Sequence, residues 1–242
     1  MKPFLSIVIP ARNEKENIAE TVRRIVLFLQ NKEIEIIVVN DHSSDTTAEE
    51  VQKLLAEFPS LLLIDNQKPP GFANALRTGW ENAQGEFVLP VMADGCDDPQ
   101  TIPLMMEKAQ EGYDLICGCR YTPGGKRVGG PLIQGFFSWL VGRSLFCLLH
   151  LPTADISNAY KMYRRRVLTN FSLREKGFAI SMEAALKFIF SGHRVADVPT
   201  IWFGRKKGKS KFRLSRTWPY IRLYWSVFVW KFSRGLLPRN ED

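Results

Sequence analysis

Short apolar runs alternate with amphipathic segments along the first half of the chain, and this alternation predicts its secondary structure. Runs rich in Val, Ile and Leu indicate buried strands, whereas apolar residues spaced three and four apart indicate helices. We expect strands at 5–10, 33–40, 61–65, 87–92 and 113–118, with helices at 14–30, 45–58, 72–83 and 102–110. Near-continuous apolar strands joined by helices are typical of a mostly parallel sheet covered on both faces. The pattern therefore predicts an α/β fold.

Two segments of the second half depart from this alternation. Residues 131–151, PLIQGFFSWLVGRSLFCLLHL, are numerous enough to cross a bilayer but include Gln134, Arg143 and two glycines. They predict a helix that lies at a membrane interface in preference to one that spans it. Residues 122–130, TPGGKRVGG, predict a flexible loop, which is a candidate active-site loop.

Composition adds limits on the class of protein. The chain has 242 residues, of which 45% are hydrophobic and 24% charged, as expected for one globular α/β domain with an appendage. Its four cysteines form no C-x-x-C pair and lie near no histidine cluster, so neither a zinc site nor a disulfide framework is indicated. The first residues form too short an apolar run for a secretory signal. These features favour a cytoplasmic compartment.

The positive charge is concentrated at the C-terminal end. From residue 205 onward, eleven Lys and Arg face two acidic residues, so the net charge of +8 leaves about −1 for residues 1–204. Aromatic residues interleave with these charges, and the run YWSVFVW favours an anionic lipid surface over RNA. We expect a domain at 1–204 and a basic amphipathic helical tail at 205–242 that associates with a membrane. The alternative is a terminal helix packed on its own domain.

Polar residues follow three of the predicted strands, where ligands bind in open α/β sheets. Asp41 follows the second strand and suits the hydroxyls of a ribose or the edge of a base. Asp94, Asp97 and Asp98 follow the fourth. Asp97 or Asp98 would alternatively cap the next helix, but Asp94 lies too early for a cap. Neither G-x-G-x-x-G nor a P-loop motif occurs, so a dinucleotide cofactor is not supported.

Several motifs occur together in one order. They are IPARNEKENI, VVNDHSSDTT, FANALRTGWENAQGEF, GCRY, DISNAYKMYRR, the pair Met182 and Glu183, and RKKGKSKF. In order and spacing, they resemble the family 2 glycosyltransferases of GT-A fold, and within them the dolichyl- and polyprenyl-phosphate sugar synthases of the mannosyltransferase type. The resemblance covers nearly the whole chain.

The resemblance implies a nucleotide-sugar site and assigns residues to it. These are Pro10, Arg12, Glu14, Val39, Asp41, Ala93, Asp94, Arg205 and Lys211, of which Asp94, Arg205 and Lys211 would be catalytic. Asp94 matches the second acid of the D-x-D motif that holds Mg²⁺ or Mn²⁺. Asp97 or Asp98 would substitute for the first acid, or water would complete the shell. Met92 stands where the first acid is expected, and Cys96 where a glutamine is common. A simple basic surface loop is the alternative for residues 205–211.

The acceptor side departs further from the resemblance. Related synthases often place an arginine four residues before a serine that binds the lipid phosphate, but here Gln134 precedes Ser138. Arg120, Lys126, Arg127 and Arg143 are candidate replacements.

The function implied is the inverting transfer of a mannose- or glucose-type hexose from a GDP- or UDP-sugar to a polyprenyl or dolichyl phosphate at the cytoplasmic membrane face. A lipid phosphate is already an anion, so it needs no general base. A saccharide or glycolipid hydroxyl acceptor would need one, either Glu183 or Asp97. The alternative for Glu183 is a solvated or salt-bridged helix residue. A catalytically weakened membrane-binding homologue, suggested by Met92, also stays open.

Overall fold

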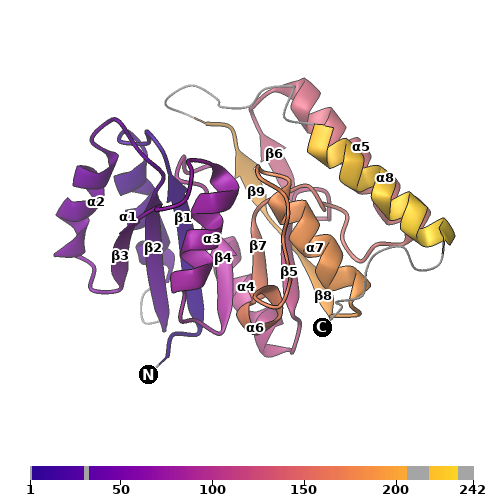
Figure 1. Ribbon diagram of the computed structural model, residues 1–242, viewed down its shortest axis with the longest axis horizontal. Helices are drawn as coiled ribbons and strands as arrows, with labels where there is room; N and C mark the ends of the chain where they lie inside the picture. The colour runs from indigo at the N-terminus through magenta and orange to yellow at the C-terminus, as the bar shows by residue number, and fades with distance from the viewer. Residues whose placement is uncertain (1, 30–32, 206–217, 234–242) are drawn as a thin grey trace.

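A seven-stranded sheet forms the centre of the molecule. The computed structural model describes residues 2–29, 33–205 and 218–233. The strands lie in the order β3-β2-β1-β4-β7-β5-β8, and among them only β7 runs antiparallel to its neighbours (Figure 1). Their bounds are β1 (Leu5–Ala11), β2 (Ile34–Asn40), β3 (Leu61–Asp65), β4 (Phe87–Pro90), β5 (Leu115–Cys119), β7 (Lys161–Arg164) and β8 (Val195–Pro199).

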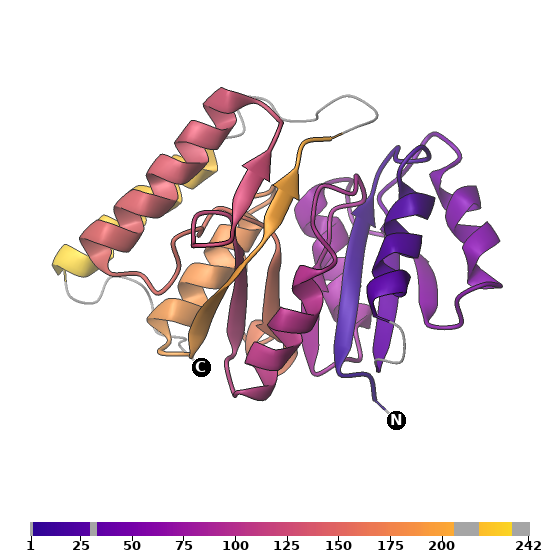
Figure 2. The same ribbon diagram turned by 180° about the vertical axis from the view of Figure 1, so that it is seen from behind.

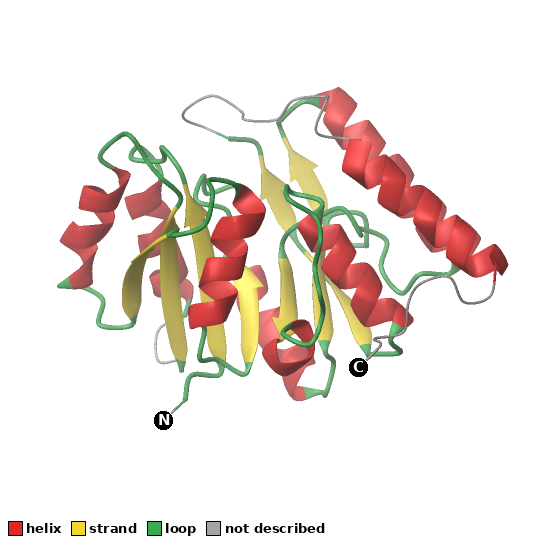
Figure 3. Ribbon diagram, viewed as in Figure 1, coloured by secondary structure: helices red, strands yellow, loops and turns green. Residues whose placement is uncertain are grey.

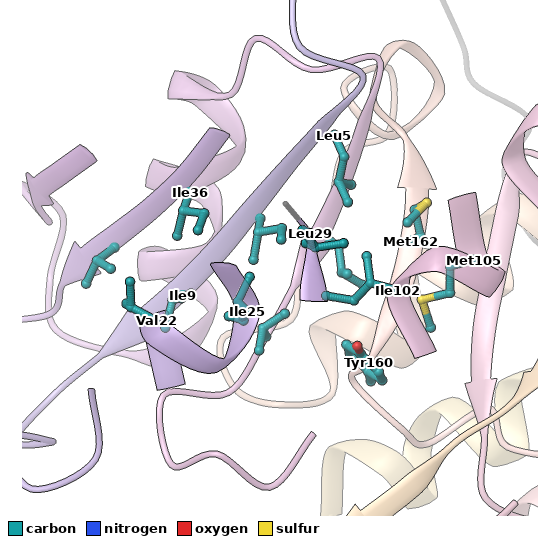
Figure 4. Close-up of a cluster of buried hydrophobic side chains, with 14 of the residues drawn as sticks. Leu5, Ile9, Val22, Ile25, Leu29, Ile36, Ile102, Met105, Tyr160 and Met162 are labelled. Atoms are coloured by element: carbon teal, nitrogen blue, oxygen red, sulfur yellow. The ribbon is translucent and has the colours of Figure 1, made fainter. Parts of the chain in front are cut away.

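Helices cover both faces of this sheet. On one face pack α1 (Ile18–Phe28), α2 (Thr47–Leu55) and α4 (Thr101–Gln110), and on the other α3 (Phe72–Asn82), α6 (Arg165–Leu168) and α7 (Ile180–Phe190). Figure 4 shows side chains of the first core, where Val22 and Ile25 of α1 meet Ile9 and Ile36 of the sheet. Because both faces are buried, β1 and β2 are apolar at nearly every position. The predicted α/β fold is confirmed.

Two further helices lie beyond one end of the sheet. The helix α5 (Leu132–Leu149) runs alongside α8 (Trp218–Ser233), and both views place the pair at the end of the molecule far from α2 (Figures 1 and 2). Leu145 of α5 and Val227 of α8 are buried in the second core. None of the helices in the described part of the chain has the length and apolar character needed to cross a membrane.

The glycine-rich segment 122–130 is only partly a loop. Three of its residues form the strand β6 (Lys126–Val128), which pairs in parallel with β9 (Ile201–Phe203). These two strands form a ribbon separate from the main sheet (Figure 3). The prediction of one flexible loop was wrong here, because a strand distant in sequence supplies the hydrogen-bonding partner.

The first helix also begins later than predicted. Residues 14–17 form a turn in which the amides of Asn17 and Ile18 both donate to the carbonyl of Glu14, 2.9 Å away. Regular helix starts only at Ile18. This turn leaves the Glu14 carboxylate at the edge of the sheet, where it takes part in the site described next.

Candidate active site

The polar residues expected to bind a ligand share one edge of the sheet. Because β1, β2 and β4 are parallel, and β5 and β4 are both antiparallel to β7, all four strands end at this edge. Glu14, Asp41, Asp94 and Arg120 follow these strands in turn. The topology therefore brings together residues from four separate sequence motifs.

An arginine bridges two of these strand ends. The Arg205 guanidinium donates to both oxygens of Glu14, from Nη2 at 2.9 Å and Nη1 at 3.1 Å. Its Nη2 also lies 3.0 Å from Oδ2 of Asp94. Burial works against the charge on Arg205, but Glu14 and Asp94 outweigh it and raise the pKa of the guanidinium. Three sequence-predicted residues thus form one charged cluster.

Backbone contacts fix the loop that carries Asp94. Its Oδ1 accepts a hydrogen bond from the amide of Cys96 at 3.2 Å. The carbonyl of Ala93 accepts from the Thr21 hydroxyl at 3.0 Å, and that of Gly95 accepts from Arg24 at 3.1 Å. Gly95 has a φ of 69°, a backbone conformation that favours glycine. The loop is therefore tied to α1, which holds Asp94 in place.

The neighbouring acids Asp97 and Asp98 have different environments. The Asp97 carboxylate is 6% exposed and accepts from the amide of Met92 at 2.9 Å. Burial raises the pKa of Asp97 to about 7, and the nearby charge of Asp94 acts in the same direction. Asp98 instead accepts from the amide of Gln100 at 3.2 Å, in the turn that precedes α4. Asp98 therefore stabilises this turn without capping the helix, because the N-cap residue of α4 is Gln100, which makes no side-chain capping hydrogen bond.

These carboxylates fit only one kind of metal site. The described residues hold no group of three or more His, Cys, Asp or Glu side chains placed to bind a metal ion. Asp94 lies at the ligand-binding edge, whereas Asp97 is turned into the protein. Mg²⁺ commonly keeps several waters and takes one or two carboxylates plus substrate phosphates. Asp94 therefore suits an ion completed by phosphate oxygens and water, and the cluster does not form an all-protein cage.

The residues expected to contact a base and ribose line the ends of β1 and β2. Pro10 pairs in register with Val39, whose side chain is fully buried. The Asp41 carboxylate accepts from Asn66 Nδ2 at 2.7 Å and from the amide of Gly71, 2.9 Å from Oδ2. Arg12 is exposed in the loop after β1. Asp41 thus fixes the start of α3 from a position at the ligand-binding edge.

A second charged cluster follows β5. Arg120 is nearly buried, and its Nε and Nη2 each donate to a carboxylate oxygen of Asp155 at 2.7 Å. Nη2 also donates to the Ser138 hydroxyl of α5 at 2.9 Å, and Ser138 lies 2.7 Å from the hydroxyl of Ser157. Burial would raise the pKa of Asp155, but the charge of Arg120 lowers it overall. Two of the acceptor candidates, Arg120 and Ser138, are therefore in contact.

The remaining predicted residues are placed less closely together. The Arg127 guanidinium lies 4.6 Å from the ring centre of Trp202, and that of Arg143 lies 5.7 Å from the ring of Phe146 on the exposed side of α5. Lys211 lies outside the described residues.

Glu183 has a structural environment. Its carboxylate accepts from the amides of Arg174, at 2.9 Å, and Glu175, at 2.8 Å. It thereby fixes the loop before α7. Both of its oxygens are thus engaged by backbone amides, and this arrangement favours a structural reading of Glu183.

Three residues at this edge were not singled out from the sequence. Asn66 directly follows β3. The argument that ligand-binding residues follow the ends of strands, which pointed to Asp41, therefore applies to Asn66 as well. Asp155 lies within the quoted motif DISNAYKMYRR, but its pairing with Arg120 leaves no local signal. Trp202 lies in a three-residue strand too short to recognise.

Comparison with known proteins agrees with this geometry. Residues 6–171 match the family described as Glycosyl transferase family 2. The dolichol-phosphate mannosyltransferase of Pyrococcus furiosus is 31% identical over 230 residues, which cover 94% of this chain but only 64% of that relative. The undecaprenyl-phosphate mannosyltransferase of Micrococcus luteus is 30% identical over 210 residues, covering 84% of this chain and 85% of the relative.

A solved structure supports the fold. The glucosyl-3-phosphoglycerate synthase of Mycobacterium tuberculosis, crystallised with Mn²⁺, UDP and glucosyl-3-phosphoglycerate, superposes with a TM-score of 0.67 at 18% identity, covering 98% of this chain and 82% of the other. The shared architecture is that of the GT-A glycosyltransferases. With most of its length matching the family, the chain belongs to glycosyl transferase family 2.

Proposed function

We propose that this glycosyltransferase moves a mannose- or glucose-type hexose from a GDP- or UDP-sugar to a polyprenyl or dolichyl phosphate, with inversion, at the cytoplasmic face of a membrane. One observation carries the proposal: the cluster of Glu14, Asp94 and Arg205 shares an edge of the sheet with the cluster of Arg120 and Ser138. The names of the relatives from Pyrococcus and Micrococcus support a polyprenyl-type phosphate as acceptor.

The first cluster would bind the donor. Departure of a nucleoside diphosphate builds negative charge on the leaving oxygens, and fixed cationic donors stabilise that charge. Arg205 supplies such donors, and Lys211 is expected to add another. Asp94 would hold a Mg²⁺ or Mn²⁺ ion, which when bound supplies a further positive charge to the diphosphate. Pro10, Arg12, Val39, Asp41 and Ala93 would surround the base and ribose.

The second cluster would bind the acceptor. Arginine forms strong charge-assisted hydrogen bonds to phosphate, and the Asp155 carboxylate already orients the Arg120 guanidinium. The Ser138 hydroxyl beside it provides a neutral donor. Because a lipid phosphate is an anionic nucleophile, the reaction requires no general base, which agrees with the structural environment of Glu183. Arg127 and Arg143 complete the predicted acceptor set.

The helices α5 and α8 would rest on the membrane. They expose large apolar side chains: Leu132, Ile133, Phe136, Phe137, Trp139, Leu140, Trp218, Ile221, Trp225 and Val229. This set, the apolar helix face, includes four residues of the C-terminal segment 205–242, which carries nine surplus positive charges. Aromatic side chains settle at lipid headgroups, and Lys and Arg pair with anionic lipid. In this proposal, residues 1–204 form the catalytic domain. Residues 205–242 complete the active site and attach the protein to the membrane.

The experiment is a transfer assay. Purified protein is incubated with GDP- and UDP-hexoses, a short-chain polyprenyl phosphate, and Mg²⁺, Mn²⁺ or EDTA, and glycolipid is detected by mass spectrometry. We expect product with one donor and a divalent ion, and none for Asp94→Ala. Nucleotide binding without any glycolipid would overturn the lipid phosphate as acceptor, and full activity of Asp94→Ala would overturn its role.

A further inference from the structure

Arg127 and Trp202 are direct neighbours across the ribbon of β6 and β9. They are register partners in the parallel pair, and the guanidinium carbon lies 4.6 Å from the centre of the indole ring. A cation over an aromatic face is attracted by the ring's quadrupole, and arginine stacks there without losing its N–H donors. The stack therefore restricts the guanidinium while leaving it able to bind an anion.

Two glycines make room for this stack. A Cβ atom at Gly130 would lie 2.7 Å from a ring carbon of Trp202, and one at Gly135 would lie 2.9 Å from Nη1 of Arg127. Gly135 belongs to the first turn of α5. The Arg127 guanidinium is thus confined between the indole and the beginning of α5. Side chains held by packing in this way bind with a smaller loss of entropy.

The partly buried Arg127 differs in its charge partners from three other arginines of the molecule. Arg205, Arg120 and Arg164 each pair with a carboxylate. Within the part of the chain that the structure describes, Arg127 forms no ion pair with a carboxylate. It touches α5 at Gly135, whereas Arg120 touches α5 at Ser138, one turn further along. Two guanidinium groups therefore lie against adjacent turns of the same helix.

The strand that carries Trp202 also contacts the loop of Asp94. Trp202 forms an antiparallel bridge with Asp97, and the amide of Phe203 donates to the carbonyl of Cys96 at 2.9 Å. The amide of Gly204 donates to Val128 of β6 at 2.7 Å. One short segment thus joins the donor loop to the strand that bears Arg127.

We propose that Trp202 is a positioning residue that holds Arg127 as a second phosphate-binding cation beside Arg120, for the phosphomonoester of a lipid acceptor. This inference rests on the proposed function. A phosphomonoester carries about −1.5 to −2 charges at neutral pH, more than one guanidinium neutralises. The ordered Arg127 supplies the second positive charge, and β9 sets its position relative to the donor.

The test compares steady-state constants of the full-length protein with a short-chain polyprenyl phosphate as acceptor. Arg127→Ala should raise the acceptor KM about 10- to 100-fold, as expected for a lost charged hydrogen bond. Trp202→Leu should raise it about three- to tenfold through the lost stack, and Trp202→Phe should restore most of the affinity. The donor KM should stay within about twofold of wild type in all three variants, because uniform loss of acceptor binding alters only the acceptor constant.

Tyr113→Leu is the matched control. Tyr113 forms a similar stack with Arg194, at 4.5 Å, before β5 and β8 begin and hence at the opposite edge of the sheet. It should leave both KM values unchanged. Unmodified polyprenol and inorganic phosphate are added as competitors. Inhibition by inorganic phosphate that Arg127→Ala weakens indicates a phosphate site, whereas inhibition by polyprenol alone contradicts it.

The outcomes separate the two proposals. If wild-type protein transfers sugar to the lipid but Arg127→Ala and Trp202→Leu keep the wild-type acceptor KM, the role of this stack is wrong and the proposed function stands. If wild-type protein makes no glycolipid, the proposed function itself fails. A change in donor and acceptor constants together, with a lowered melting temperature, would assign Trp202 a structural role and overturn the inference.

Discussion

Arg205 and Asp94 form an ion pair at 3.0 Å, and the same guanidinium binds both oxygens of Glu14. The position that a diphosphate or its counter-ion would occupy thus already has a protein cation beside it. Since Arg205 carries three hydrogen bonds or ion-pair contacts, its side chain is ordered before any donor arrives. Preorganised charge of this kind is what stabilises a leaving group.

Replacing Arg205 should therefore impair the chemical step. We expect Arg205→Ala to lower kcat about 10²- to 10³-fold, the usual effect of removing one preorganised donor. Arg205→Lys should recover only part of this loss, because an ammonium group lacks the planar fork that binds two oxygens. The measurement is single-turnover transfer at saturating donor.

The control for this prediction is Arg23→Ala, which removes an exposed arginine of α1 paired with Glu57 at 3.2 Å. It should leave kcat unchanged. A kcat for Arg205→Ala within a factor of three of wild type would show that the leaving group does not depend on this residue.

The buried pair of Arg120 and Asp155 should matter for folding as well as for acceptor binding. Asp155→Ala leaves a buried guanidinium without its counter-charge, and such losses cost about 3–5 kcal/mol of unfolding free energy. The double variant Arg120→Met/Asp155→Leu should recover most of that stability but not the activity. Urea unfolding monitored by circular dichroism measures both effects.

Lys108→Ala serves as the comparison, because Lys108 and Glu111 form an exposed pair at 2.8 Å. It should leave the unfolding free energy nearly unchanged. Equal losses for Asp155→Ala and Lys108→Ala would mean that burial adds nothing to the Arg120–Asp155 pair.

Much of the fold follows from local sequence, whereas the clusters do not. The strand at 5–10 is recognisable because both of its faces are buried, so nearly every position is apolar. The ends of such strands also located Asp41 and Asp94 correctly at one edge. Ion pairs between distant side chains could not be predicted in this way. Arg120 and Asp155 lie 35 residues apart, and no local sequence pattern connects them.

Short strands were the other structural feature that the sequence did not predict. β6 and β9 have three residues each, too few for a period to show, and glycines surround β6. The ribbon forms because each strand provides the other's hydrogen-bonding partner, which is a tertiary effect. For the same reason, Glu183 could not be assigned from its position on a helix, since its role depends on the amides of Arg174 and Glu175.

Acid should weaken the opposite edge of the sheet through Asp114. Burial would raise the pKa of Asp114, but the hydrogen bond from Arg164 at 2.7 Å and the neighbouring Arg194 amide and His193 lower it overall. A lowered folded-state pKa means that the stabilisation is present above the unfolded value of about 3.9 and is lost as pH falls through the folded value.

The corresponding variant is Asp114→Asn. Between pH 5 and pH 2, the wild type should lose more unfolding free energy than the variant, whereas at pH 7 the wild type should be the more stable. Urea titrations at pH 7, 5, 3 and 2 give the comparison. Parallel pH profiles for the two proteins would contradict the contribution of Asp114.

The apolar helix face should determine membrane binding. Trp225 is 61% exposed on α8 and Phe136 is 57% exposed on α5, although both are large apolar side chains. Burying one such side chain in the headgroup region is worth about 1.5–3 kcal/mol, so Trp225→Ser or Phe136→Ser should each lower partitioning onto anionic vesicles roughly tenfold or more. Leu104→Ser, at a 42% exposed position of α4, should leave partitioning unchanged. The measurement is co-sedimentation with vesicles of phosphatidylglycerol and phosphatidylcholine at two salt concentrations, with molecular mass determined in parallel.

If the face instead binds a second copy of the chain, both serine variants would convert a dimer to a monomer while vesicle binding stayed constant. Partitioning that falls with added salt but not with either serine variant would assign the attraction to the basic segment alone, and would show that the exposed aromatic side chains do not enter the bilayer.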